Sequence, residues 1–466
     1  MEISHSFIVI FLFAQKIPAL EAQSVCTYDP SVRHCSCLPL NFNNILSIIS
    51  CISASSFEFI GGNYVNAEYF NTFNVELLQA QNEVQSQLTK ISFVNLVLSE
   101  DFLFDFIKWL QKIPVTLLSF ENTTFVGQYN RTPEKQQPHI SSLQFINVSS
   151  HPLIQTDTVF YGLGNWMSTL GKLTVSKSNL KAFPCNISLN FEFMSDLDLS
   201  ENLIQEEGLS SSFCSGAFPI LKILKLQHNN LANFGSVCQT LRKYNLLAHL
   251  DLSQNNFSSM SNFICDWQPS LIRLNLSYTG LKHVDIGLPK NCEVLDLSHN
   301  KIEMLNISLT RLRELYLSYN AFTTISPMGN LPFLQVLAVD GNLIETINRG
   351  QLQHFEHLRS FKGDNNPYTC SCSFVTEMRE IAETDWIVQK WPEGYICNSP
   401  SSIKDMLVDD VNRSFFECHT HLLIVLICII VLLLSIAIII CFVKIHRSNK
   451  TRSSRTDSRI SNSVQF

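Results

Sequence analysis

The sequence has no excess of basic charge and lacks the motifs of known enzyme active sites. It contains 33 Lys and Arg against 40 Asp and Glu, a formal net charge of -7, so it offers no positive field that would hold a polyanion. It has no nucleophile elbow, phosphate-binding glycine loop, HExxH sequence or paired-carboxylate pattern. We therefore expect a protein that binds a partner other than nucleic acid, without catalysis, cofactor or metal.

The first residues lack the Lys or Arg that usually opens a signal peptide. Residues 7–14 are nevertheless apolar, and the small Ala22 follows soon after them, which is typical of a signal peptide cleaved near that residue. A short buried helix is the alternative. The cysteines favour the signal peptide, because they indicate a chain that folds in an oxidising compartment.

Most cysteines stand in two clusters near the ends of the chain. Such clusters form either disulfides or zinc sites, and neither has the paired CxxC motifs or the histidines of a zinc finger. The clusters are Cys26, Cys35, Cys37 and Cys51, and then Cys370, Cys372, Cys397 and Cys418. Asn-x-Ser/Thr sequons predict a glycosylated exterior, and they lie at Asn122, Asn130, Asn147, Asn186, Asn256, Asn275, Asn306 and Asn412.

Residues 422–443 contain no charged side chain. At about 1.5 Å per residue this segment is long enough to cross a hydrocarbon core of about 30 Å. The Lys and Arg residues after it predict a cytoplasmic tail and an extracellular N-terminal part, hence a single-pass type I protein of the plasma membrane. A glycolipid-anchor signal would end in its apolar stretch. The tail is too short to fold as a signalling domain, so we expect another protein to carry the signal.

A leucine pattern, L-x-x-L-x-L-x-x-N, recurs through the middle of the chain, and residues 247–255 are its clearest copy. The clear copies follow one another at intervals of 20 to 27 residues, as in leucine-rich repeats. Each L-x-L predicts a short strand with inward leucines, and stacking predicts an α/β solenoid with a curved parallel sheet of about twelve repeats. Besides Leu250, the copies centre on Leu197, Leu224, Leu274, Leu295, Leu315, Leu337 and Phe361, with weaker ones on Ile91, Leu118, Leu143 and Leu173.

The asparagine of each repeat is expected to bond backbone groups that stacking would otherwise bury unpaired. Thr279 interrupts this ladder, and its hydroxyl must substitute. The ladder is Asn202, Asn229, Asn255, Asn300, Asn320, Asn342 and Asn366. The predicted domains are a signal peptide (1–22), an N-terminal cap and apolar pocket region (23–87), repeats (88–366), a C-terminal cysteine cap (367–421), a transmembrane helix (422–443) and a cytoplasmic tail (444–466).

The C-terminal cluster resembles a known capping module. Residues 366–372, Asn-Pro-Tyr-Thr-Cys-Ser-Cys, and residues 391–395, Trp-Pro-Glu-Gly-Tyr, followed by Cys397 and Cys418, resemble the cap of toll-like receptors. That resemblance implies bridges from Cys370 to Cys397 and from Cys372 to Cys418. A solenoid needs such caps, since its end turns would otherwise expose the core.

The N-terminal part resembles the monocyte differentiation antigen family of lipopolysaccharide co-receptors, in order over roughly residues 24–305. The resemblance rests on the first four cysteines and on residues 57–62, 182–185, 265–267, 274–281 and 287–289. It implies bridges Cys26–Cys37, Cys35–Cys51, Cys185–Cys214 and Cys238–Cys265, with Cys292 left as a small core residue. The chain departs from mammalian members, which have a glycolipid anchor, no toll-type cap and more acidic residues between the first cysteines.

The same resemblance implies a function. It implies a receptor that takes lipopolysaccharide from a serum carrier protein, holds the acyl chains of lipid A in an N-terminal apolar pocket, and delivers the lipid to a toll-like receptor with its small lipid-binding partner. An adhesion or decoy receptor that binds a protein on its concave face is the alternative. A toll-like receptor without its signalling module would explain the cap and helix, but not the N-terminal cysteines.

Apolar and aromatic residues are abundant where the pocket would lie. Ordinary core packing is the alternative for each of them, so the region is a firmer prediction than its members. The predicted ligand-binding residues are Ile52, Phe57, Phe59, Ile60, Tyr64, Tyr69, Phe70, Phe73, Phe93, Phe102, Leu103 and Phe106. Lys90, Lys108 and Lys112 are candidates for contact with lipid phosphates. A sugar on Asn275 would stand on the concave face and direct the ligand toward the N-terminal end.

Overall fold

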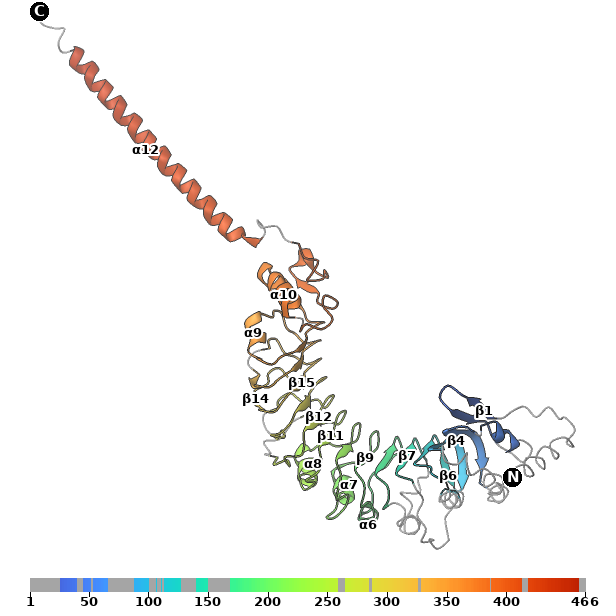
Figure 1. Cartoon of the computed structure of the whole chain (residues 1–466). Helices are drawn as coiled ribbons and strands as arrows, with labels where there is room; N and C mark the ends of the chain where they lie inside the picture. Colours follow the sequence, from blue (N-terminus) through green and yellow to red (C-terminus); the bar gives the residue numbers. More distant parts are fainter. Residues whose placement is uncertain are drawn as a thin grey trace, which may run out of the picture.

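The structure is a computed structural model that describes residues 26–39, 45–51, 53–65, 88–99, 106, 110, 113–126, 140–149, 168–258, 265–284, 287–325, 328–385, 387–412 and 418–460. These residues form one long sheet of stacked turns, followed by a cap and a single long helix (Figure 1). Thirteen consecutive parallel strands run from β3 to β18 in chain order. The predicted leucine-rich-repeat solenoid is confirmed.

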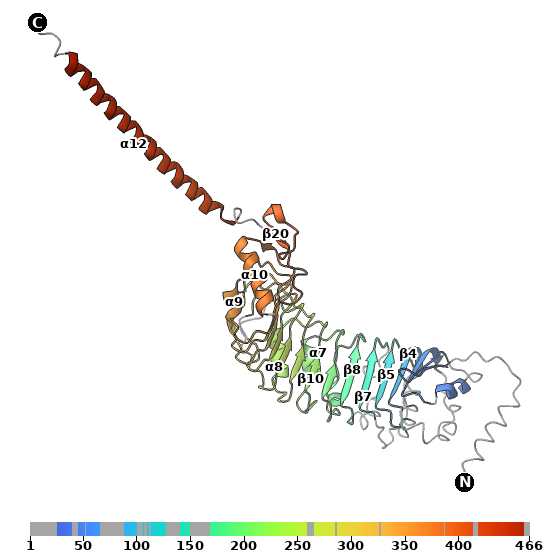
Figure 2. The ribbon, with the colours of Figure 1, turned by 45° about the horizontal axis from the view of Figure 1, so that its top comes forward.

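The strands are short in the regular repeats and longer toward the N-terminus, where the sheet faces the viewer in Figure 2. In chain order they are β3 (Ser56–Tyr64), β4 (Lys90–Ser99), β5 (Leu117–Glu121), β7 (Ser142–Ile146), β8 (Lys172–Ser176), β9 (Asp196–Asp198), β10 (Ile223–Lys225), β11 (His249–Asp251), β12 (Arg273–Asn275), β13 (Val294–Asp296), β15 (Glu314–Tyr316), β17 (Val336–Ala338) and β18 (Ser360–Lys362). The parallel ladder thus already includes β3, which precedes the repeats predicted from residue 88.

The outer side of the arc carries short helices and small strand pairs (Figure 1). The helices are α6 (Cys185–Ser188), α7 (Glu206–Ser212), α8 (Phe234–Leu241) and α9 (Arg349–Gln353). Asn233 caps α8 by accepting a hydrogen bond from Ser236 N at 3.0 Å. The remaining strands are β6 (Thr124–Val126), which pairs with β4, and β14 (Ile307–Ser308), which pairs with β16 (Gly329–Asn330). Helices outside and strands inside make the strand side concave.

Two columns of apolar side chains fill the solenoid. In the regular turns the central leucine of each strand pairs in register with the next, from Leu197 through Leu337 to Phe361, and all are buried. Full burial of each leucine contributes about 1.5–3 kcal/mol. In the N-terminal turns a second column consists of phenylalanines, with Phe93 5.2 Å from Phe120 and Phe120 5.4 Å from Phe145 between ring centroids. In these turns phenylalanine therefore replaces leucine in the second column, while the first column continues with Leu118, Leu143 and Leu173.

The asparagine ladder has the expected geometry. Asn229 Nδ2 donates to Leu199 O in the preceding turn and Leu226 O in its own turn, at 2.9 and 3.1 Å, while its Oδ1 accepts from Ile204 N at 3.0 Å. At the interruption, the Thr279 hydroxyl donates to Leu276 O at 2.6 Å. Threonine lacks the amide oxygen with which asparagine accepts hydrogen bonds from the preceding turn. In that turn Phe257 N donates instead to the backbone oxygen of Thr279, at 2.9 Å.

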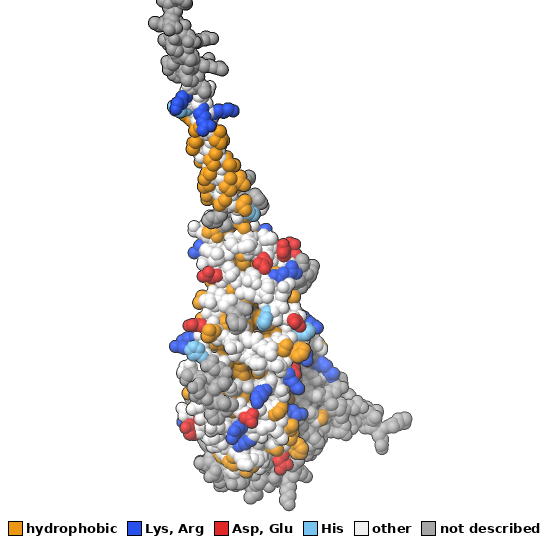
Figure 3. Space-filling view, turned by 90° about the vertical axis from the view of Figure 1, so that its left-hand side faces the viewer, with side chains coloured by type: hydrophobic (Ala, Val, Ile, Leu, Met, Phe, Trp, Pro, Cys, Tyr) orange, Lys and Arg blue, Asp and Glu red, His pale blue; other side chains and the backbone are white. Residues whose placement is uncertain are grey.

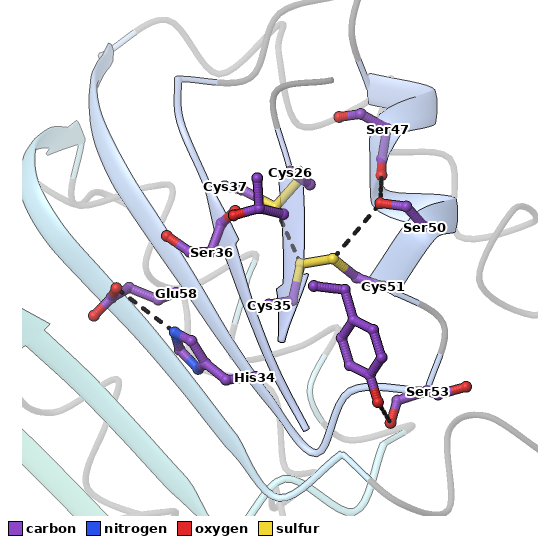
Figure 4. Close-up of a disulfide and its surroundings, with 12 residues drawn as sticks. Cys26, His34, Cys35, Ser36, Cys37, Ser47, Ser50, Cys51, Ser53 and Glu58 are labelled. Atoms are coloured by element: carbon purple, nitrogen blue, oxygen red, sulfur yellow. Dashed lines mark hydrogen bonds and ion pairs between the residues drawn. A yellow bond between two sulfur atoms is a disulfide. The ribbon is translucent and has the colours of Figure 1, made fainter. Parts of the chain in front are cut away.

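Both ends of the solenoid are closed by disulfides. At the N-terminus, β1 (Cys26–Asp29) pairs antiparallel with β2 (His34–Cys37), which leads the parallel sheet beside η1 (Ile45–Cys51). Cys26 joins Cys37 and Cys35 joins Cys51 (Figure 4). The sulfurs and Ala54 form a small core of their own, and Phe57 and Phe59 pack against both this core and the main one.

The C-terminal cap comprises β19 (Tyr368–Thr369), α10 (Cys372–Asp385), β20 (Cys397–Ser399) and η3 (Ser401–Ile403). Its bridges are Cys370–Cys397 and Cys372–Cys418, and two further bridges, Cys185–Cys214 and Cys238–Cys265, tie neighbouring turns. These are the pairs that the two resemblances imply. Cys292 is a free, buried thiol whose pKa burial raises to about 12, so it is inert at neutral pH.

The chain continues as α12 (Thr420–Ile460), which projects away from the cap (Figure 1). Figure 3 shows its apolar column and the Lys and Arg side chains beyond it. The candidate membrane span is Leu422–Lys450, and its central apolar window makes no buried contact within the protein. The helix runs well past the predicted end at residue 443, because adding a residue to an existing helix costs far less than nucleating one.

Candidate functional site

The N-terminal end of the sheet contains half-buried aromatic side chains. Phe57 and Phe59 lie on the core side of β3, and Phe59 stacks on Phe93 with 5.4 Å between ring centroids. Both are only half buried, whereas Phe93, Phe120 and Phe145 further along the sheet are buried. Ile60 is also half buried, but it does not belong to the apolar core clusters. Apolar surface is therefore exposed in part at this end.

The predicted pocket residues divide into three groups. Phe57, Phe59, Ile60 and Tyr64 lie together on β3 and are half buried. Phe93 and Phe106 are buried and contact each other edge to face at 5.0 Å, so ordinary core packing describes these two. The other six, namely Ile52, Tyr69, Phe70, Phe73, Phe102 and Leu103, lie outside the described residues, as do Lys108 and Lys112.

The concave side of this end is polar. His34 Nδ1 lies 2.9 Å from Ser56 Oγ, and His34 Nε2 lies 3.7 Å from Glu58 Oε2, an arrangement visible in part in Figure 4. These three side chains alternate with Cys35, Phe57 and Phe59, which point the other way, as strand geometry requires. Lys90, the predicted phosphate contact, is exposed at the start of β4. Polar concave groups thus border the half-buried aromatics.

A second feature, which sequence reasoning missed, is a hollow in the middle of the concave face. Its volume is about 270 Å³. It spans five consecutive strands, β10 to β13 and β15, and its lining is Ile223, Leu224, Lys225, His249, Leu250, Asp251, Arg273, Leu274, Asn275, Val294, Asp296 and Tyr316. The leucines form its floor, and the residues on either side of them project into it.

Charges of both signs surround the hollow. Lys225 Nζ lies 3.2 Å from Asp198 Oδ2; burial alone would lower its pKa, but the carboxylate outweighs burial and raises it. Burial, followed by the charge of Arg273, lowers the pKa of His249. Burial and the bond to Glu314 raise the pKa of Tyr316 to about 12. At neutral pH the lysine in the hollow is therefore charged, while the imidazole and the phenol are neutral.

The aspartates of the concave face are held by their own turns. Asp251 Oδ1 accepts from Ser253 N and Ser253 Oγ at 2.9 and 2.7 Å. Asp296 makes the same pair of bonds with Ser298 at 2.9 and 2.6 Å. The sequence signal was the recurring Asp-Leu-Ser, because an Asp side chain readily bonds the backbone two residues on. These bonds fix the orientation of each carboxylate and leave its Oδ2 on the concave side.

A stack of aromatic rings, with Tyr278 and Tyr319 exposed and His299 half buried between them, runs along one edge of the concave face. Tyr278 and His299 are 4.0 Å apart, and His299 and Tyr319 are 4.5 Å apart, with nearly parallel planes. Each residue has a positive φ and stands immediately before the ladder position. At the equivalent position of the next turn, a Cβ on Gly341 would lie 2.7 Å from the Tyr319 ring, so glycine leaves room for it.

Comparison with known proteins gives consistent relatives, although no family model matches the chain. Toll-like receptor 2 of Macaca mulatta is 33% identical over 364 residues, 76% of this chain and 46% of that protein. The Homo sapiens protein is 32% identical over 377 residues, 80% and 48% respectively. The Ovis aries protein is 28% identical over 429 residues, 89% and 54%. The chain is a leucine-rich-repeat protein.

Its curated relatives are toll-like receptors, and the leucine-rich-repeat chain spans about half the length of those it matches. Among solved structures, the crystal structure of the mouse RP105/MD-1 complex matches with a TM-score of 0.44 at 17% identity, over 78% of this chain and 68% of that chain. These relatives are of the same type, toll-like receptors, as the proteins whose cap residues 366–397 resemble. The resemblance to the monocyte differentiation antigen, and the ligand that it implies, remain expectations.

Proposed function

We propose that the protein is an innate-immune co-receptor that binds bacterial lipopolysaccharide and delivers it to a toll-like receptor. The lipid would arrive on a serum carrier protein and leave to a toll-like receptor with its small lipid-binding partner. The similarity to Toll-like receptor 2 supports a leucine-rich-repeat receptor of innate immunity. The N-terminal cysteine pattern supports the co-receptor, because it resembles that of the monocyte differentiation antigen family.

The observation that carries the proposal is the half-buried apolar strand β3 at the N-terminal end. Phe57 and Phe59 end a phenylalanine stack whose inner members are buried, and Ile60 lies outside the core clusters. An acyl chain that covers such surface gains about 0.8 kcal/mol per CH₂. Twelve or so buried CH₂ groups would thus supply binding free energy on the order of 10 kcal/mol before the cost of ordering.

The expected location is the plasma membrane, with α12 as the single span. The apolar part of the helix is not buried against the described part of the chain, and its basic residues follow at the C-terminal side, which favours a cytoplasmic location for that side. Only a short connection separates the cap bridge at Cys418 from the start of α12 at Thr420. The solenoid would therefore stand close to the lipid surface.

Replacing Ile60 with aspartate is expected to abolish lipopolysaccharide binding while the protein stays folded. A carboxylate covered by an acyl chain must be desolvated, which costs several kcal/mol, whereas Ile60 is outside the core and its loss leaves no cavity. The measurement is saturation binding of labelled lipopolysaccharide to the full chain in lipid nanodiscs.

The matched control is Leu343→Asp, which also replaces an aliphatic side chain with aspartate, at an exposed residue, 52% accessible, in the C-terminal half. It should bind like the wild type. Equal loss in both variants, or no saturable binding by the folded wild type, would contradict the proposal and favour an adhesion or decoy receptor that binds a protein on its concave face.

A further inference from the structure

Asn275 differs from the other described sequon asparagines in its surroundings. Asn122, Asn147, Asn186, Asn256, Asn306 and Asn412 are exposed, whereas Asn275 is half buried. Its side chain lines the concave hollow. A sugar on Asn275 would therefore begin inside a depression, whereas sugars on the other six would begin on open surface.

The amide of Asn275 is fixed by two hydrogen bonds. Oδ1 accepts from Ser277 N at 2.9 Å, and Nδ2 donates to Asp251 Oδ2 at 3.2 Å. A glycosylated Nδ2 keeps one N–H, so it can retain the bond to Asp251 while the other position bears the sugar. The amide plane is thus set, and with it the direction in which the sugar leaves the backbone.

The lining of the hollow suits a sugar ring. Sugars offer hydroxyl groups to carboxylates and guanidinium groups, and C–H faces to aromatic rings. Asp296 offers a carboxylate whose Oδ1 is already held by Ser298, and Tyr316 offers a half-buried ring. Within the described residues, the Arg273 side chain has no hydrogen bond or ion pair, so its donors are available.

We propose that the first sugar of an N-glycan on Asn275 lies in this hollow, held by Arg273, Asp296 and Tyr316, so that the glycan covers the centre of the concave face against protein ligands. Attachment occurs on the unfolded chain. A bond forms between Nδ2 and the anomeric carbon of a lipid-diphosphate-linked oligosaccharide, the bond from that carbon to the diphosphate oxygen breaks, and the Nδ2 proton leaves with the lipid diphosphate. The glycan then folds in with the solenoid.

The glycan would cover the middle turns, β10 to β15, whether or not lipopolysaccharide binds at β3. A protein partner would then have to contact the uncovered ends or the edges of the solenoid. The glycan would act as a fixed part of the concave wall.

The first test is glycopeptide mass spectrometry of the full chain from animal cells. Asn275 is expected to be occupied and to retain oligomannose, because a glycan whose first sugar is held in the hollow lies against the concave face, where processing enzymes reach its mannoses poorly. Asn256, exposed in the preceding turn, should carry processed glycans. In Tyr316→Ala and Arg273→Ala, the excess of oligomannose at Asn275 over Asn256 should be lost.

The second test uses two lysines of matched surroundings. Lys172 and Lys225 are each 43% exposed, and each lies 3.2 Å from an aspartate. In Asn275→Gln, labelling of Lys225 by an amine-reactive reagent should rise relative to Lys172. An unoccupied Asn275, glycans processed as at Asn256, an unchanged glycan pattern in the two variants, or an unchanged labelling ratio would each overturn the inference.

Discussion

Replacing Asn300 with alanine is expected to lower the free energy of unfolding by about 3–6 kcal/mol, since two or more buried polar groups lose their partners at about 1–3 kcal/mol each. Asn300 Oδ1 accepts from Thr279 N and Leu281 N, both at 3.0 Å. Its Nδ2 donates to Leu276 O and Leu297 O at 2.9 and 3.0 Å. Denaturant unfolding of the full chain measures the change.

This position should be the most sensitive of the ladder. The Thr279 hydroxyl also contacts Asn300 Oδ1, at 3.2 Å. The polar groups of Thr279, which interrupts the ladder, therefore depend on Asn300 for their hydrogen bonds. Hydrogen exchange at the Thr279 and Leu281 amides should accelerate with the loss of stability. Asn291→Ala is the control, because that half-buried asparagine makes one solvent-exposed bond, to Pro269 O, and its loss should cost about 0.5 kcal/mol or less. Equal effects at the two positions would refute the ladder account.

Replacing Cys35 and Cys51 together with serine is expected to destabilise the N-terminal cap by about 2–5 kcal/mol, the usual effect of removing a native disulfide. The cap has little other core, since four of its five buried members are cysteines. Phe57 and Phe59 pack against this core, so β3 should lose hydrogen-exchange protection and lipopolysaccharide binding should fall with it.

Cys292→Ala supplies the control for the disulfide variant. This thiol is buried and free, and its Sγ lies 3.2 Å from Val294 O. The replacement removes one sulfur and no crosslink, so a loss of about 1 kcal/mol is expected, local to β13. A double-serine variant with wild-type protection of β3 would show that the cap does not hold the strand in place.

The repeats could be predicted because every turn uses the same leucine packing and the same asparagine hydrogen bonds. Each buried leucine and each ladder asparagine serves the same neighbours one turn away, so the pattern is visible in the sequence. Strand β3 was missed as part of the ladder because Phe-Glu-Phe-Ile-Gly-Gly has neither the leucines nor the asparagine. Its register with β4 nevertheless aligns Phe57 with Ile91 and Phe59 with Phe93.

The concave features could not be predicted from one repeat at a time. The hollow arises where Lys225, Asp251, Asn275, Asp296 and Tyr316 occupy the same register position on neighbouring strands. In the sequence each of them stands at a variable position of its own repeat, so that their proximity is not visible. The stack of Tyr278, His299 and Tyr319 has the same origin, and a comparison of residues immediately before each ladder position would have found it.

The central claim, that lipopolysaccharide binds at the N-terminal end, is tested most directly by photo-crosslinking. A lipid A analogue with a photoreactive acyl chain is added to the full chain in nanodiscs, and labelled peptides are identified by mass spectrometry. The account predicts labels on Ser56–Tyr64, lost when unlabelled lipopolysaccharide competes. Competed labels on the concave strands between Ile223 and Tyr316, with none on Ser56–Tyr64, would contradict it.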